Sequence, residues 1–277
     1  MRLGLSILLL LVVAAAHASA DPQYRWLDDS RAHEARSRLE DRFAPPPGFE
    51  RVAAADGSFA AWLRGLPLRP AGTPVRSFRG DVIRAGDDRR VAAVVDLDVG
   101  TRDLQQCADS IMRLDAEWRF AAGRGADIRY AIGRGQDLAF ARWASGDRPR
   151  IADDDRVTWA HRAAADDSHA ALRAYLDVVF AEAGTATLAD TAHRVERADL
   201  RAGDFFVVGG HPGHAVLVLD VAVDAAGHRR ALLGQGFMPA QDFHVLAHDG
   251  DPWFSLDGDT VDTPFWTPFP LSALRRL

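Results

Sequence analysis

Residues 198–220 read ADLRAGDFFVVGGHPGHAVLVLD, and this stretch decides the fold. The apolar runs Phe205–Val208 and Ala215–Val223 predict two strands separated by a turn rich in Gly and Pro. Apolar residues at both parities of the second run predict a central strand that is covered on both faces. Arg230–Leu233 predicts a third strand, joined to the second by a short hairpin loop that contains Gly. We therefore expect an antiparallel sheet.

Two stretches outside these strands have the period of an amphipathic helix. The spacing of Asp103 and Gln106 fits a capping box, and an apolar stripe that includes Cys107 follows it. A second stripe covers residues 168–183, and Gly184 is a natural helix stop. The sequence thus predicts an α+β fold in which an antiparallel sheet packs on helices, the first of them opening at Asp103.

The N-terminus has the features of a secretory signal peptide. Arg2 precedes an almost wholly apolar run, Leu3–Ala16, and Ala18–Ala20 has the small-residue form that signal peptidase accepts. The apolar run is too short for a membrane span, which needs about 20 residues. We expect cleavage after Ala20 and a periplasmic or secreted protein. Residues 21–277 are then expected to form a single globular domain with no membrane span.

Composition narrows the classes of function. The formal net charge is −6, which argues against nucleic acid as a partner, because its recognition needs a basic surface. The hydrophobic fraction of 48% is ordinary for a protein with a buried core. Cys107 is the one cysteine, so no internal disulfide can form. It is either an inert core thiol on the apolar stripe or a reactive one.

The second half of the chain resembles a family of cell-wall peptidases. In residues 167–235, a helix ending in Ala-Gly and a Gly-Asp-apolar strand precede a strand that opens with His214, as in NlpC/P60 and papain-like cysteine peptidases. The resemblance implies that His214 is the general base and that Gln235 orients its imidazole. It also implies a papain-like core in residues 161–277, with residues 21–160 as an N-terminal elaboration that carries the Cys107 helix.

The position of the nucleophile departs from that family. Ser168 stands where the family has its cysteine, at the start of the helix before the Gly-Asp strand. Cys107 lies on an earlier helix, where the positive end of the helix dipole favours a thiolate. Ser168 is therefore an alternative nucleophile or a helix N-cap. Backbone N–H groups near Gln106, or its side chain, could bind the oxyanion.

Four further motifs resemble a bacterial exported family of unknown function. They are DLQQCAD at 103–109, PPGF at 46–49, PGHAV at 212–216 and MPAQ at 238–241. This second resemblance implies a shared fold and no established activity.

The functional prediction is an exported thiol hydrolase that acts on amide bonds, with cell-wall peptide or glycan as the expected partner. Cys107, His214 and Gln235 are the predicted catalytic residues. The alternative is a non-catalytic envelope protein of the same fold that binds glycan, peptide or a protein partner. Two further histidine sets lack the spacing that aligns zinc ligands, so no metal or other cofactor is expected. These sets are His211 and His214 with Asp204, and His244 and His248 with Asp249.

Overall fold

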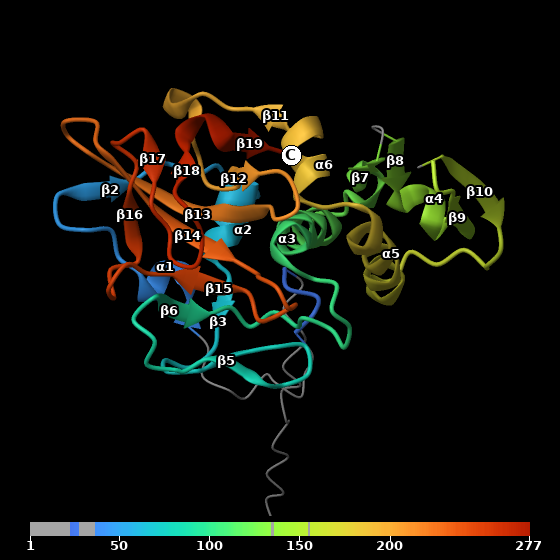
Figure 1. Ribbon diagram of the computed structural model, residues 1–277, viewed down its shortest axis with the longest axis horizontal. Helices are drawn as coiled ribbons and strands as arrows, with labels where there is room; N and C mark the ends of the chain where they lie inside the picture. Colours follow the sequence, from blue (N-terminus) through green and yellow to red (C-terminus); the bar gives the residue numbers. More distant parts are fainter. Residues whose placement is uncertain (1–22, 28–36, 134–135, 155) are drawn as a thin grey trace, which may run out of the picture.

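The computed structural model describes residues 23–27, 37–133, 136–154 and 156–277 (Figure 1). The predicted signal peptide and its cleavage site lie outside the described residues. In the described part, helices and antiparallel sheets combine, so the predicted α+β class is confirmed. The helices are α1 (Leu39–Arg42), α2 (Phe59–Arg64), α3 (Cys107–Ala121), α4 (Phe140–Ala144), α5 (His169–Glu182) and α6 (Thr185–Thr191).

One large antiparallel sheet forms the centre of the molecule. Its strands are β2 (Phe49–Arg51), β6 (Val91–Val94), β11 (His193–Arg194), β12 (Phe205–Val208), β13 (His214–Asp224), β14 (Arg229–Gln235), β15 (His244–Leu246), β16 (Trp253–Ser255) and β19 (Leu274–Arg276). The strand order is β11-β19-β12-β13-β14-β15-β6, with β16 paired to β14 and β2 paired to β13. Strands from both halves of the chain therefore share this sheet.

Shorter strand pairs surround the main sheet. They are β1 (Ser37–Arg38) with β3 (Pro67–Leu68), β4 (Val75–Arg76) with β5 (Val82–Arg84), β7 (Arg129–Ile132) with β8 (Gln136–Ala139), β9 (Asp147–Ile151) with β10 (Val157–His161), and β17 (Thr260–Val261) with β18 (Phe269–Pro270). The pairs β7–β8 and β9–β10 lie with α4 at one end of the molecule, next to α5 (Figure 1). They form the irregular middle of the chain.

The predicted central strand is confirmed, because both faces of β13 are buried. Ala215 and Leu217 pack into the core cluster that contains the apolar side chains of α3. Val216 and Val218 pack into a second cluster on the opposite face, together with Phe269. Since successive side chains of a strand point to opposite faces, this alternation buries β13 between two layers from His214 to Ala222.

The predicted start of the first helix was wrong. Helix α3 begins at Cys107, and Gln106 is its N-cap residue, whose backbone N–H donates to the Asp109 carboxylate at 3.0 Å. The Asp103 carboxylate instead accepts a hydrogen bond from the backbone N–H of Ala240 at 2.7 Å. Asp103 therefore connects the loop before α3 to the segment that contains Ala240. It does not cap the helix.

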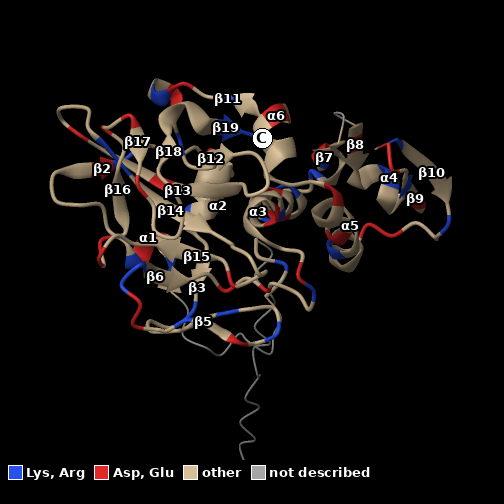
Figure 2. Cartoon of the chain, viewed as in Figure 1, with Lys and Arg blue, Asp and Glu red and all other residues tan. Residues whose placement is uncertain are grey.

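The second predicted helix is confirmed as α5, with Ser168 as its N-cap. Charged residues of both signs lie on the loops and helices around the sheet (Figure 2). Within the described ranges, no helix combines the length and the apolar composition that a membrane crossing requires.

Candidate functional site

Three buried polar side chains form a row across neighbouring strands of the main sheet. His214 opens β13, Gln235 ends β14 and His244 opens β15, and each is 1% exposed. The His214 Nε2 atom lies 2.7 Å from Gln235 Oε1. The Gln235 Nε2 atom lies 3.3 Å from His244 Nε2. Because a carboxamide oxygen only accepts, His214 Nε2 carries a proton and Nδ1 is left as the basic nitrogen.

Aromatic rings cover the first imidazole. The ring of His214 lies 4.7 Å from Phe237, 5.1 Å from Trp266 and 6.0 Å from Phe269, measured between centroids. Burial among these rings lowers the pKa of His214 from 6.5 to about 4, although the bond to Gln235 opposes the shift. The imidazole is therefore neutral at physiological pH, the form in which a histidine accepts a proton.

Cys107 is the first residue of α3 and is 6% exposed. Burial raises the pKa of its thiol to about 11. The backbone N–H groups of Ala215 and Ala108 lie against the sulfur and act in the opposite direction, as does the N–H of Cys107 itself. The Asp109 carboxylate adds a smaller increase to the thiol pKa. The resting thiol is protonated, because burial outweighs the opposing effect of these backbone N–H groups on its pKa.

The thiol and the imidazole lie at the same end of one strand. Ala215 directly follows His214, so a sulfur against the Ala215 N–H is one residue from the imidazole. Among the described residues, Cys107 and His214 form no hydrogen bond with each other. The ring of His214 contacts Phe269, on the sheet face opposite α3. Helix α3, which begins with Cys107, and the His214 imidazole therefore lie on opposite faces of the sheet at the same end of β13.

The structure does not bring Ser168 to this site. Ser168 is exposed, and its hydroxyl accepts the backbone N–H of Ala171 at 3.2 Å. The neighbouring His169 bonds to Glu117 at 2.9 Å. Glu117 lies on α3 ten residues after Cys107, which is about 15 Å along a helix. Ser168 thus lies towards the other end of α3 and has the role of an N-cap.

Two glutamines precede the thiol: the side chain of Gln105 is buried, whereas that of Gln106 lies at the surface. The Gln105 side chain is 2% exposed; its Nε2 donates to the Asp98 carbonyl and its Oε1 accepts from Arg113 at 3.0 Å. The Gln106 amide donates to the Asp103 carboxylate at 3.1 Å on the outside of the loop. Backbone N–H groups in the first turn of a helix have no partner within it. The backbone N–H of Cys107 and the side-chain amide of Gln106 therefore remain the candidate oxyanion donors.

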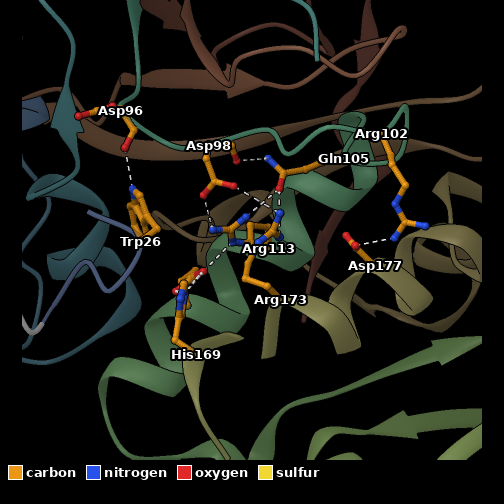
Figure 3. A network of polar contacts seen from close by, with 10 residues as sticks. Trp26, Asp96, Asp98, Arg102, Gln105, Arg113, His169, Arg173 and Asp177 are labelled. Carbon is orange, nitrogen blue, oxygen red and sulfur yellow. Dashed lines mark hydrogen bonds and ion pairs between the residues drawn. The ribbon is translucent and has the colours of Figure 1, made fainter. Parts of the chain in front are cut away.

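A buried ion network holds the loop that ends at the thiol (Figure 3). Arg113 is completely buried, and its guanidinium bonds to Glu117 at 2.6 Å, to Asp98 at 2.9 Å and to Gln105 at 3.0 Å. Asp98 and Gln105 both belong to the loop before α3. Sequence reasoning missed this network, although a charged pair at i and i+4 inside an apolar helical stripe is a readable signal.

The two histidine sets considered as metal ligands do not converge. Asp204 is bonded to Arg276 at 2.6 Å, and Asp249 is bonded to Arg89 at 2.6 Å. Across the described ranges, no three histidine, cysteine or acidic side chains are grouped as metal ligands would be.

A cavity of about 760 Å³ lies near the other end of α3. Its lining includes five arginines: Arg64, Arg119, Arg124, Arg201 and Arg276. Ion pairs bind three of them, Arg64 to Asp220, Arg119 to Asp115 and Arg276 to Asp204. The Arg124 guanidinium lies 4.0 Å from the Trp118 ring centroid, and its Nη2 atom is buried without a partner. This cavity is separate from the thiol and carries an unsatisfied cationic donor.

The model of a family described as "Domain of unknown function (4846)" matches residues 39–276. A search of curated proteins and a search of solved structures found no match.

Proposed function

The chain thus belongs to the family described as a domain of unknown function (4846), and from its own residues we propose that it is an exported thiol hydrolase acting on amide bonds. Cys107 is the nucleophile, His214 is the general base and Gln235 orients the imidazole. One observation carries the proposal: Cys107 is the first residue of α3, and α3 packs against β13, the strand that begins with His214.

The chemistry follows from this placement. A thiol becomes a strong nucleophile when a base removes its proton and nearby dipoles stabilise the thiolate. The start of α3 and the Ala215 N–H supply the dipoles, and Nδ1 of His214 supplies the base. The resting pKa values of about 11 for the thiol and about 4 for the imidazole oppose this proton transfer, so the proposal requires that substrate binding bring the two values together. In a site without substrate, catalytic hydrogen bonds are often long and tighten on binding. Because the His214 ring faces the side of the sheet opposite α3, the proposal requires that the proton pass around the end of β13 when the substrate amide enters.

The fold and the substrate class are parts of the same proposal. A thiol at a helix start, a histidine at a strand start and an amide side chain on the next strand match a papain-like core. The predicted export and the resemblance of residues 167–235 to NlpC/P60 peptidases favour envelope peptides, including those of peptidoglycan, as substrates.

The test is to replace Cys107 and to measure amide hydrolysis. Purified peptidoglycan and fluorogenic peptide amides serve as substrates, and released amines are quantified. We expect Cys107→Ala to reduce the rate roughly 10³-fold or more, because removing a nucleophile removes the covalent step. Cys107→Ser should be nearly as inactive.

Ser168→Ala is the matched control, and it should keep wild-type activity because the exposed Ser168 only caps α5. Full activity of Cys107→Ala, or a loss confined to Ser168→Ala, would overturn the assignment of the nucleophile. A wild-type protein that releases no amine from any of these substrates would overturn the hydrolase itself.

The arginine-lined cavity supports a second function, the binding of an anionic ligand such as a peptide carboxylate. The Nη2 atom of Arg124 beside the Trp118 ring is buried without a partner, and a carboxylate attached to an apolar group would bind it once the guanidinium turns into the cavity. We expect Arg124→Gln to weaken binding of acetylated peptide acids roughly 10-fold or more in calorimetric titration. Arg142→Gln, which alters an exposed arginine over Trp159, is the control and should bind normally.

The binding function is independent of the thiol. Cys107→Ala should therefore bind the same peptide acids as the wild type does. Equal affinity of Arg124→Gln and the wild type would remove the cavity as a binding site.

A further inference from the structure

The row of polar side chains continues past Gln235 to a second buried histidine. The His244 Nδ1 atom lies 3.0 Å from the backbone carbonyl oxygen of Asp242. A carbonyl oxygen has no proton to donate, so Nδ1 of His244 must carry the hydrogen. Burial lowers the pKa of His244 to about 4, so the ring is neutral and holds one proton. Its Nε2 atom is therefore an acceptor.

The donor and acceptor roles in this bond determine those in the next two bonds of the row. Since His244 Nε2 accepts, it takes a hydrogen from the Gln235 amide nitrogen, 3.3 Å away. The carboxamide then turns its oxygen to His214, whose Nε2 must carry the proton. In the reversed orientation, the Gln235 oxygen would face the unprotonated Nε2 of His244. Two acceptors would then oppose each other, and the bond between Gln235 and His244 would be lost. One backbone carbonyl thus selects the orientation of every group in the row.

We propose that His244 is a positioning residue that fixes the tautomer of His214 through Gln235. In catalysis this role rests on the proposed function, because it keeps Nδ1 of His214 as the base for Cys107. His244 touches neither the thiol nor a substrate amide. A neutral glutamine alone lacks this direction, because its amide presents a donor and an acceptor of nearly equal shape.

The end of the row is itself held in place. The Asp242 carboxylate accepts the backbone N–H of Arg76 at 2.8 Å and pairs with Arg69 at 3.1 Å. The ring of Phe265 lies edge-on to His244 with centroids 6.3 Å apart. Because His244 is 1% exposed, bulk water does not compete for its Nε2. The carbonyl that sets the direction is therefore a fixed point of the fold.

The experiment compares His244→Leu with His244→Gln. Leucine removes the acceptor, whereas glutamine places a carboxamide near the position of Nε2 but lacks the bond of Nδ1 to the Asp242 carbonyl that fixes the direction. Without an acceptor, the Gln235 amide is expected to turn and donate to His214, because a buried N–H without a partner is disfavoured. Nitrogen NMR of ¹⁵N-histidine protein reports which ring nitrogen of His214 carries the proton. Denaturant unfolding of both variants verifies that they fold.

In the wild type we expect one tautomer of His214, protonated at Nε2. In His244→Leu the Nδ1-protonated form should become the major one, and kcat should fall roughly tenfold with little change in KM. His244→Gln should give a mixture of the two tautomers and an intermediate kcat, because its carboxamide can present either an acceptor or a donor to Gln235. A single Nε2-protonated form in folded His244→Leu would overturn the proposal.

The NMR readout separates this proposal from the hydrolase. If the tautomer shifts in His244→Leu while the wild type hydrolyses nothing, the positioning role stands and the hydrolase falls. If the wild type is active and His244→Leu keeps both the tautomer and kcat, the hydrolase stands and the positioning role falls.

Discussion

Replacing Arg113 with Met should lower the free energy of unfolding by roughly 3–5 kcal/mol. Methionine keeps much of the apolar volume of arginine but removes the charge that compensates Glu117, which is 1% exposed. A buried carboxylate that loses its cation is costly, and only the bond from His169 would remain to Glu117. Urea denaturation followed by circular dichroism at pH 7 measures the loss.

Arg102→Met is the matched control for this experiment. Arg102 also pairs with an acid, Asp177, but its side chain is 61% exposed. Exposed ion pairs contribute less than about 1 kcal/mol, so this variant should unfold almost as the wild type does. Equal stabilities of the two variants would show that the buried network does not stabilise the fold.

The network also links stability to the site. Through Asp98 and Gln105, Arg113 holds the loop that delivers Cys107 to the start of β13 (Figure 3). Arg113→Met should therefore reduce amide hydrolysis even at urea concentrations where the protein remains folded. The Arg102 variant should not.

The strands were readable in the sequence because their burial leaves a local pattern. Residues 205–208 and 215–223 are apolar runs between Gly-rich turns, and they form β12 and most of β13. The start of α3 was misplaced because the Asp103 carboxylate bonds to Ala240, a contact between residues 137 positions apart. Local spacing does not contain contacts of that range.

The candidate site was readable in part for the same reason. Cys107 could be named because it is the one cysteine of the chain, and His214 and Gln235 because residues 167–235 resemble NlpC/P60 and papain-like peptidases. The role of His244 was not readable, since it depends on the pairing of β14 with β15 and on a backbone carbonyl. Residue identity also gave no sign that Trp266 and Phe237 would cover His214 and keep it neutral.

Acidification from pH 7 to pH 4 should destabilise the protein strongly. His214 and His244 each have a pKa lowered from 6.5 to about 4 in the folded state. The unfolded chain therefore takes up these protons first as the pH falls. The stability that the neutral rings contribute is complete above pH 6.5 and is lost as the pH approaches 4. A shift of this size corresponds to about 3 kcal/mol for each histidine.

Asp109 acts in the opposite direction. Burial raises the pKa of its carboxyl from 3.8 to about 7, so the folded state takes up this proton first as the pH falls. Its contribution is complete below pH 3.8 and is lost as the pH rises through 7, which offsets part of the loss at the histidines. Asp109→Asn removes the offset and should make unfolding steeper in pH, whereas His244→Leu removes one histidine and should make it shallower.

Urea denaturation at half-unit steps from pH 7.5 to pH 4 measures these slopes. Glu117, whose pKa is lowered from 4.5 by Arg113 and His169 against the effect of burial, responds mainly below the histidine window. A stability that is flat between pH 6.5 and pH 4.5 in both the wild type and Asp109→Asn would contradict the neutral, covered imidazoles. It would mean that water reaches His214 and His244 in the folded protein.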